Sequence, residues 1–436
     1  MILKWDFMNL KAELEKELKV YNEFKNKNIK LDISRGKPAS EQIDFVSDIF
    51  QKAETENNFY MQRKGQDKLD VGNYGLLAGI SELRHLFADL LDLEDDNLFI
   101  GGNSSLNLMY DLLVLNIMFG NQDSEMPWGK LESMKMLCPS PGYDRHFMMA
   151  EHLGFDLISV PMREDGPDMD IVESLVANFP NIKGIWCTPL YSNPDGFVYS
   201  DKTVERLAKM EAAKDFRIFW DNAYFTHHLV EGKVNRIANI IKLSEQYGNP
   251  NRVYQFSSTS KITFPGGGVS LIASSKDNID YILSHFKYKT ISYDKMNMYR
   301  HALVFKTKED VESHMEKLAK FNRPKFDLTL SILEKELKDY EKYLFYTKPE
   351  GGYFVSLYTM SNCAKKTYNL CKDAGLIMTT AGDTFPYGID PNDSHLRIAP
   401  TFPDLKELEN ALKLFVTCVK IAILEELINK QDNFIE

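Results

Sequence analysis

The chain has 436 residues, of which 44% are hydrophobic and 26% are charged, as is usual for a globular protein with enough core for two or three domains. Its formal net charge of −11 argues against a nucleic-acid-binding protein, which normally presents a basic face, and no run of about 18 apolar residues predicts a membrane span. The five cysteines are scattered and form no CxxC pair, so we expect a reduced, cytoplasmic compartment and no metal site.

The N-terminal part predicts a charged amphipathic helix over roughly 6–27, and its start lacks the apolar core and cleavage site of a secretory signal. From about residue 98, short apolar runs bounded by turn residues alternate with helical stretches. Continuous apolar runs of this kind are typical of strands that are buried on both faces of an α/β sheet. The expected strands cover residues 98–102, 134–139, 156–162, 182–189, 216–224, 252–258 and 269–274.

The C-terminal part of the chain changes character and predicts a smaller α+β domain. A long charged helix is expected over 309–343, with a break or a new helix start at Pro324. Further strand-like runs and a closing helix from about Asp404 follow it. We therefore predict a large domain over 60–310, and a small domain that combines 1–59 with 311–436.

Polar side chains follow several of the predicted strands, and ligands of open α/β sheets bind beyond the carboxyl ends of the strands. Ser104 and Ser105 lie between a strand and an apolar helix, where free N–H groups and hydroxyls could hold an anion. Capping of that helix is the alternative for both serines. Asn193 follows another strand, in an Asn-Pro-Asp-Gly stretch that is also an ordinary turn sequence.

Asp221 and Tyr224 stand at the end of a further apolar run. A carboxylate in such a place is costly unless it has a partner, such as a protonated ring nitrogen, although capping of the next helix would also satisfy it. His227 and His228 suggest a metal site at first glance. No other cluster of ligand residues is near them in the sequence, so we interpret the pair as packing or polar contacts.

Lys261 lies between a run of hydroxyl residues and three glycines, in "SSTSKITFPGGG". An amine at the end of a buried strand is desolvated, which lowers its pKa and frees its lone pair to attack a carbonyl. A lysine that forms a Schiff base with an aldehyde cofactor needs this setting. Farther along, Arg397 lies between apolar strand residues, where a guanidinium requires a carboxylate partner.

Together these segments resemble the fold-type-I pyridoxal-phosphate enzymes of the class I/II aminotransferases, and most of all the aspartate aminotransferase branch that is grouped with the MocR-like proteins. The resemblance implies a large domain with a mostly parallel, seven-stranded sheet in an α/β/α sandwich, plus a small α+β domain from both termini. It extends over residues 34–402 through "SRGKPASEQIDF", "NYGLLAGISELRHLF", "GGNSSLNLMYD", "PSPGYDRHF", "NPDG", "DNAY", "STSKITFPGGGVS", "PEGGYF" and "HLRIAPTF".

The resemblance implies that pyridoxal 5′-phosphate is the cofactor. Lys261 would hold it as an internal aldimine and move a proton between Cα of the substrate and C4′ of the cofactor. Asp221 would pair with the protonated pyridine nitrogen and keep the ring an electron sink. The other implied cofactor contacts are Tyr224 and Asn193 at the phenolic oxygen, Ser104, Ser105 and Ser258 at the phosphate, and Tyr74 at a phosphate across the interface of a homodimer.

The resemblance also implies the substrate contacts. Arg397 would clamp the α-carboxylate through a bidentate fork, and Gly36 would approach the substrate closely. The side-chain carboxylate of aspartate or glutamate would need a second cation, because the α-carboxylate occupies Arg397. Arg145 and Arg35 are the candidates, and a structural salt bridge is the alternative for each.

Two positions depart from the pattern of the family. Many relatives have a phosphate-binding arginine about eight residues after the lysine, where this sequence has Gly268 and Val269. Backbone N–H groups of the glycines could replace that arginine as an anion-binding nest, or the glycines could only permit a tight turn. The segment "CPSPGYDRHF" has no tryptophan to stack on the cofactor ring, and Tyr143 is the candidate for that role.

The expected function is transfer of an amino group from an L-amino acid, with aspartate foremost, to a 2-oxo acid, with 2-oxoglutarate foremost, by a ping-pong mechanism. The same lysine, aspartate and arginine would serve a β-decarboxylase, a C–S lyase or a cyclopropane-forming synthase, so these stay as alternatives. A non-catalytic MocR-type regulator is a third possibility, although the 33 residues before "SRGKPAS" do not resemble a DNA-binding module.

Overall fold

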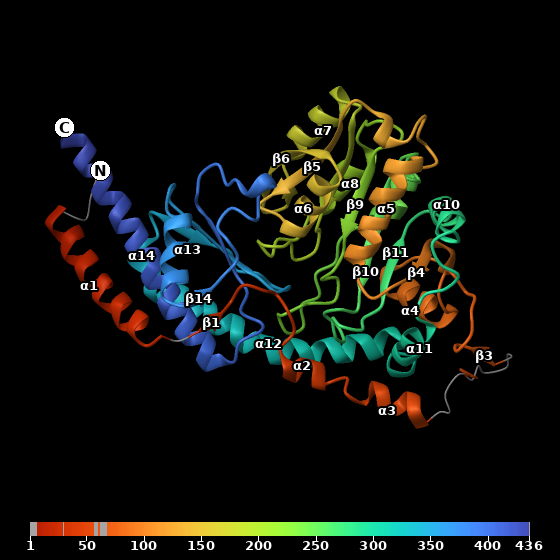
Figure 1. Cartoon of the computed structure of the whole chain (residues 1–436), viewed down its shortest axis with the longest axis horizontal. Helices are drawn as coiled ribbons and strands as arrows, with labels where there is room; N and C mark the ends of the chain where they lie inside the picture. The colour runs from red at the N-terminus through yellow and green to blue at the C-terminus, as the bar shows by residue number, and fades with distance from the viewer. Residues whose placement is uncertain (1–6, 29, 56–59, 62–67, 436) are drawn as a thin grey trace.

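The computed structural model describes residues 7–28, 30–55, 60–61 and 68–435. These residues form two lobes, and one long helix runs along both of them (Figure 1). Residue 6 of the predicted N-terminal helix, and the segment 56–59 beside the predicted domain boundary, lie outside the described residues. No helix within the described ranges is long and apolar enough to cross a membrane.

The larger lobe is built on a mixed sheet with the strand order β4-β11-β10-β9-β8-β5-β6-β7. The pairs of β9 with β8 and β10, and of β5 with β6 and β8, are parallel, whereas β11 is antiparallel to both of its neighbours. The strands are β4 (Leu98–Ile100), β5 (Met134–Ser140), β6 (Phe155–Arg163), β7 (Gly166–Pro167), β8 (Ile182–Cys187), β9 (Arg217–Asp221), β10 (Val253–Ser258) and β11 (Ser270–Ala273).

All seven predicted strands are present in this sheet, but the sheet has eight strands, so the predicted number was one too low. The additional strand, β7, has two residues and pairs antiparallel with the end of β6 at the sheet edge. Strands β8, β9, β10 and β11 are buried along their whole length, which explains their continuous apolar runs.

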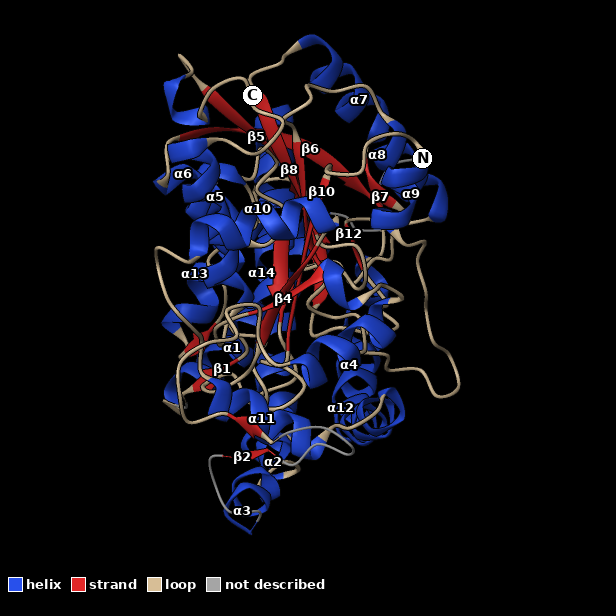
Figure 2. Cartoon of the chain, turned by 90° about the vertical axis from the view of Figure 1, so that its right-hand side faces the viewer, coloured by secondary structure: helices blue, strands red, loops and turns tan. Residues whose placement is uncertain are grey.

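Helices cover both faces of this sheet, so the larger lobe is an α/β/α sandwich (Figure 2). Phe99, Phe219 and Phe256 pack against one helical layer, and Ile185, Ile218 and Leu271 face the other. The first layer contains α5 (Ser105–Phe119), α6 (Asp144–His152) and α10 (Lys276–Phe286). The second contains α4 (Ser81–Leu91), α7 (Met169–Asn178), α8 (Asp201–Lys209), α9 (Ile240–Gln246) and α11 (Lys295–Val304).

The smaller lobe joins the N-terminal and C-terminal parts of the chain in one apolar cluster, and Figure 1 shows the first and the last helix side by side in it. Leu10 and Tyr21 of the first helix share this cluster with Leu412 and Phe415 of the last. Its elements are α1 (Phe7–Asn26), β1 (Leu31–Asp32), β12 (Leu344–Tyr346), β13 (Val355–Thr359), α13 (Ala364–Asp373), β14 (Leu376–Ile377), β15 (His395–Ile398) and α14 (Leu405–Ile435). Strands β12, β13 and β15 form an antiparallel sheet, and β1 pairs parallel with β14.

The long helix α12 (Lys308–Leu337) packs on both lobes. Val311 and Leu318 belong to the core of the larger lobe, whereas Phe326 and Leu333 belong to that of the smaller. The predicted break at Pro324 was wrong, because the helix continues through this residue. A proline inside a helix costs one backbone hydrogen bond, and the burial of apolar side chains on both sides of Pro324 offsets that cost here.

The chain between α1 and α4 also reaches the larger lobe. It contains α2 (Ser40–Asp44), α3 (Asp48–Thr55), β2 (Tyr60–Met61) and β3 (Leu69–Asp70). Val46 belongs to the core of the larger lobe, and α3 lies beside α11. The residues at which one domain ends and the other begins therefore stay a prediction. Short 3-10 turns complete the fold at Asp95–Asn97, Trp128–Lys130, Lys338–Tyr340 and Pro386–Gly388.

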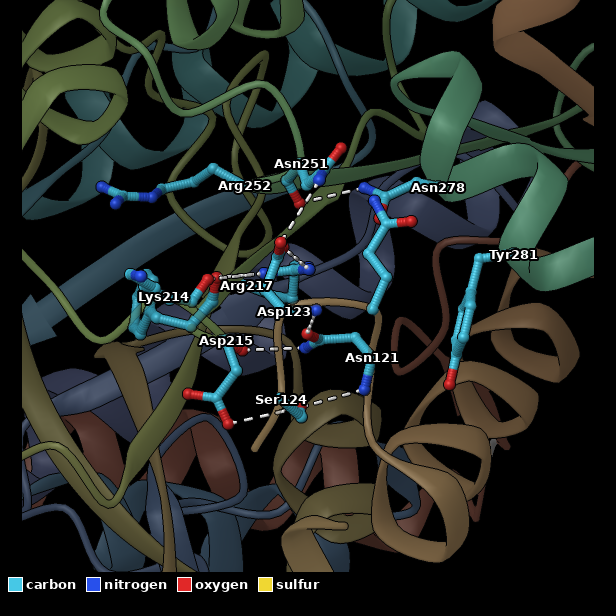
Figure 3. A network of polar contacts seen from close by, with 12 residues as sticks. Asn121, Asp123, Ser124, Lys214, Asp215, Arg217, Asn251, Arg252, Asn278 and Tyr281 are labelled. Atoms are coloured by element: carbon cyan, nitrogen blue, oxygen red, sulfur yellow. Dashed lines mark hydrogen bonds and ion pairs between the residues drawn. The ribbon is translucent and has the colours of Figure 1, made fainter. Parts of the chain in front are cut away.

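The starts of the central strands are held by a polar network that contains a buried arginine (Figure 3). Arg217, at the first position of β9, is 0% exposed and pairs through Nη2 with Oδ2 of Asp123 at 2.5 Å. Its Nη1 donates to the carbonyls of Lys214 and Phe216 at 3.1 and 3.0 Å. Nearby, Lys183 of β8 contacts both carboxylate oxygens of Asp215 at 2.8 and 2.9 Å.

Candidate active site

Lys261 lies in the turn that follows β10, where Nζ is 4.8 Å from the centroid of the Tyr224 ring. Burial lowers the pKa of Lys261, and the negative charge of Asp221 opposes that effect. The residue as a whole is partly buried. Its position is therefore that of a desolvated nucleophile close to a carboxylate, as the sequence predicts.

Asp221 ends β9 and is buried, with one carboxylate oxygen paired and the other free. Oδ2 lies 2.9 Å from Nε2 of His146, and Oδ1 has no hydrogen-bond partner among the described residues. Leaving a buried carboxylate oxygen unpaired is costly, so Oδ1 is suited to accept a hydrogen bond from a cationic N–H group of a ligand.

His146 is a site residue that the sequence did not indicate. It lies in the first turn of α6, and its ring stacks on Trp186 with a centroid distance of 4.4 Å and an interplanar angle of 9°. The contact with Asp221 joins residues 75 positions apart. The histidine is visible within "PGYDRHF", but nothing local in the sequence shows that α6 packs against the end of β9.

Arg397 of β15 is the contribution of the smaller lobe to the site, and its guanidinium has several partners. Nε and Nη2 donate to Oγ1 of Thr379 at 3.1 and 2.9 Å, and Nη1 donates to Oδ1 of Asn193 at 3.1 Å. Nη1 also lies 3.3 Å from Oδ1 of Asp144. The guanidinium carbon is 4.8 Å from the centroid of the Phe354 ring.

Gly36 packs against the same phenylalanine. A Cβ atom at this position would lie 2.4 Å from Cζ of Phe354, so no larger residue fits without a shift of the ring. Because Phe354 in turn contacts Arg397, the glycine maintains the packing behind the guanidinium. The predicted site residues Asn193, Arg397 and Gly36 are thus linked in one group of contacts.

The three predicted phosphate-binding serines come together through the turn before α5. Ser104 is the N-cap residue of α5, but its hydroxyl makes no capping hydrogen bond, and Ser105 is the first residue of the helix. Ser258 donates to Oγ of Ser260 at 3.2 Å, and Ser260 donates to the carbonyl of Asn103 at 3.3 Å. Hydroxyls and free N–H groups therefore converge at a helix N-terminus, which favours an anion.

The glycine run after Lys261 is held close to these serines. A Cβ atom at Gly268 would lie 3.1 Å from the backbone nitrogen of Ser260 and 3.2 Å from its Oγ. Asn297 of α11 donates to the carbonyls of Gly267 and Gly268 at 2.8 and 3.0 Å. A side chain at position 268 would therefore require Ser260 to shift by a few tenths of an ångström.

Two tyrosines lie near the Asp221 carboxylate. Tyr224 is buried, and burial raises the pKa of its hydroxyl. Tyr143 precedes α6 and meets the His146 ring edge-on at a centroid distance of 4.9 Å. Burial, followed by the charges of Asp144 and Asp221, raises the pKa of Tyr143 to about 12. Both hydroxyls therefore stay protonated near neutral pH and can donate hydrogen bonds.

Tyr74, Arg145 and Arg35 are the predicted site residues that the structure leaves at the surface. Tyr74 is 78% exposed, in a loop whose carbonyls at Asp70 and Tyr74 accept hydrogen bonds from Lys295 at 3.1 and 3.2 Å. Arg145 and Arg35 are exposed, and neither forms an ion pair within the described part of the chain.

The two adjacent histidines make polar contacts. Nε2 of His227 lies 3.2 Å from the carbonyl oxygen of Lys261, and burial lowers the pKa of His227 to about 3. Nδ1 of His228 lies 2.6 Å from the hydroxyl of Tyr191. Across the described residues, no group of three His, Cys, Asp or Glu side chains is arranged to hold a metal ion.

Comparison with known proteins assigns the chain to a family. The family model described as aspartate amino-transferase matches residues 7–431. An aspartate aminotransferase of Corynebacterium glutamicum is 44% identical over 410 residues, which cover 94% of this chain and 93% of that protein.

Solved structures agree with this match. The crystal structure of an aspartate transaminase from Corynebacterium glutamicum superposes with a TM-score of 0.92 at 42% identity, over 97% of this chain and 98% of that one. An α-aminoadipate aminotransferase of Thermus thermophilus, solved with a phosphopyridoxyl-leucine, shares the fold with a TM-score of 0.73 at 18% identity, over 97% of this chain and 96% of that one. The match along almost the full sequence shows that the chain belongs to the aspartate aminotransferase family.

Proposed function

We propose that this aminotransferase depends on pyridoxal 5′-phosphate and moves the amino group of aspartate to 2-oxoglutarate in a ping-pong reaction. The observation that carries the proposal is Oδ1 of Asp221, a buried acceptor without a partner in the described chain. The charge of Asp221 also acts on Lys261, where it opposes the lowering of the pKa by burial. The choice of aspartate is supported by the Corynebacterium glutamicum relative, which is named for that substrate.

The donor set fits this cofactor. Its pyridine ring, when bound, takes up the electron pair that remains when the Cα–H bond of the substrate breaks. Asp221 would hold a proton on the ring nitrogen, and His146 keeps that carboxylate in place through its 2.9 Å contact. The remaining residues that would hold the cofactor are Lys261 at the aldehyde, Tyr224 and Asn193 at the phenolic oxygen, Tyr143 against the ring, and Ser104, Ser105 and Ser258 at the phosphate.

The chain's own side chains would then perform the binding and the proton transfer. Arg397 would bind the α-carboxylate and so fix the orientation of the Cα–H bond, because the bond that breaks depends on this orientation. Lys261, with its lowered pKa, would take the proton from Cα and deliver it to C4′ of the cofactor, and it would make the reverse transfer in the other half-reaction. The side-chain carboxylate would be bound by Arg145 or Arg35, both of which are exposed in the single chain.

We further propose that the protein is a cytoplasmic homodimer with shared sites, in which Tyr74 reaches the phosphate of the partner subunit. The exposure of this tyrosine, 78%, supports the proposal because its side chain is accessible to a partner subunit. The division into a large domain over 60–310 and a small domain from 1–59 and 311–436 is part of the same proposal, as is the MocR-like branch.

The function is tested with purified protein, pyridoxal 5′-phosphate and a panel of amino donors and 2-oxo acids. We expect aspartate and 2-oxoglutarate to yield oxaloacetate and glutamate in equal amounts. Lys261→Ala should lower the turnover by at least about a thousandfold, as is typical for loss of a catalytic base and nucleophile. A preference for neutral or aromatic donors would overturn the substrate assignment, and release of carbon dioxide with formation of alanine would instead indicate a β-decarboxylase.

A further inference from the structure

The guanidinium of Arg397 forms an ion pair with a carboxylate of the protein itself. An arginine side chain has five N–H donors. Nε and Nη2 donate to Thr379, while Nη1 donates to Asn193 at 3.1 Å and lies 3.3 Å from Oδ1 of Asp144. Thr379 and Asn193 are neutral, so Asp144 is the charged partner of Arg397 among the described residues.

Asp144 is placed there by the first turn of α6, between Tyr143 and His146. Its side chain is 19% exposed, whereas that of Arg397 is 7% exposed, so the carboxylate is the more accessible of the two groups. The helix dipole alone stabilises an aspartate in the first turn of a helix, and this is the alternative explanation for Asp144. Among the described residues, the carboxylate of Asp144 forms an ion pair with Arg397.

A second carboxyl group lies close to this pair. Burial, and then the charge of Asp144, raises the pKa of Asp383, while Arg397 opposes that effect. Two acidic side chains are therefore within electrostatic reach of the one guanidinium. An incoming carboxylate must compete with Asp144 for Nη1, since two anions at one N–H group repel each other.

We propose that Asp144 sets the affinity for the substrate α-carboxylate: it neutralises Arg397 before substrate binds, and the α-carboxylate then displaces it. This inference rests on the proposed function, because it takes Arg397 as the α-carboxylate site. The partial exposure of Asp144 lets it turn toward water when the exchange occurs. Asp144 then lowers the affinity for every substrate with an α-carboxylate by a common factor, whatever its side chain.

The test measures anion binding to the cofactor-loaded enzyme without turnover. Succinate has no amino group and cannot be transaminated, so its dissociation constant by isothermal titration reports the carboxylate sites alone. We expect Asp144→Asn, which keeps the shape and removes the charge, to bind succinate about tenfold more tightly. The KM values for an acidic and a neutral amino donor should fall by similar factors.

Glu151→Gln is the matched control, because Glu151 is an exposed acid of the same helix and lies outside the site. It should leave the succinate affinity and both KM values unchanged. If the asparagine variant does not fold, Asp144→Ser is used in its place, because serine is well tolerated at the start of a helix. It should show the same gain in affinity.

Unchanged or weaker succinate binding in both Asp144 variants would overturn the inference and make the aspartate a support for Arg397. A gain confined to dicarboxylic substrates would also overturn it, because the competition would then involve the side-chain carboxylate. The proposed function fails separately: a wild-type enzyme that transaminates no amino acid would refute it, whereas the succinate titration would still report on Asp144 and Arg397.

Discussion

Asp195 is a carboxylic acid in a fully buried position, two residues after Asn193 and in contact with the smaller lobe. It is 0% exposed, and the hydroxyl of Tyr358 donates to its Oδ1 at 2.8 Å. Burial raises the pKa of Asp195 to about 6, and hydrogen bonds from Tyr358 and Ser356 oppose this rise. The folded protein therefore favours the neutral acid in weakly acidic solution, where an exposed aspartate would be ionised.

This shift predicts a pH dependence of stability. Between pH about 4 and about 6 the folded state keeps a proton that the unfolded state releases, so the free energy of unfolding falls as the pH rises through this window. The asparagine of Asp195→Asn has no proton to lose. Relative to this variant, the wild type should lose about 2–3 kcal/mol between pH 4 and pH 7.

Thermal unfolding of the wild type and of Asp195→Asn across this pH range measures the free energy of unfolding of each. The prediction concerns the difference between the two curves of stability against pH. Other carboxyl groups with raised pKa values, such as Asp383, cancel in that difference. Parallel curves would show that Asp195 is ionised in the folded protein throughout the range.

The polar residues at strand ends could be predicted because their setting is local. Lys261, Asp221 and Asn193 each follow an apolar run, so the order of strands and turns was enough to bring them to one edge of the sheet. His146 and Asp144 could not be predicted in this way. Their partners, Asp221 and Arg397, are 75 and 253 positions away and meet them only after α6 packs against two other elements.

Helix α6 shows how one short element serves several parts of the site. Its first turn presents His146 to Asp221 and Asp144 to Arg397, while Arg145, between them, points to the surface. Neighbours on a helix point about 100° apart, so adjacent residues of one turn cannot all face the same ligand. This geometry explains why a basic residue in a site-forming segment can still be exposed.

The buried arginine at the start of β9 can be compared with an arginine on the surface. We expect the removal of each to change the free energy of unfolding by a different amount. Arg217 is 0% exposed and pairs with Asp123 (Figure 3), whereas Arg206 is 25% exposed and pairs with Asp170 and Glu173. We expect Arg217→Ala to lower the free energy of unfolding by about 3–5 kcal/mol, because the carbonyls and the carboxylate lose their donors inside the protein. Arg206→Ala should cost about 0–1 kcal/mol, since water replaces its contacts.

Denaturant unfolding of the two variants, followed by circular dichroism, compares them directly. Equal changes in the free energy of unfolding would mean that burial does not determine how much these ion pairs stabilise the protein. A small effect for Arg217→Ala alone would show that water enters the network once the guanidinium is removed.

The two lobes meet at the site, and the smaller lobe supplies Arg397 while the larger supplies Lys261 and Asp221. Helix α12 joins the cores of both lobes without a break at Pro324, so one continuous helix connects the two lobes that contribute these residues. The sequence suggested a break there because proline lacks a donor, but burial along the helix on both sides of Pro324 outweighs that loss. The strand β7 was missed for a different reason, since two residues carry no periodic signal.

A dimer with shared sites predicts that two impaired variants restore activity when they are combined. Tyr74→Ala should weaken the phosphate site of the partner subunit, and Lys261→Ala should inactivate its own. In a mixed dimer, the subunit that keeps Lys261 receives an intact Tyr74 from the other, so one of its two sites is complete. After unfolding and refolding of an equal mixture, half of the dimers are mixed, and about a quarter of the wild-type activity should return. Each variant refolded alone is the control and should stay impaired. No gain in the mixture, together with sedimentation of an active monomer, would show that Tyr74 acts within its own subunit or takes no part in the site.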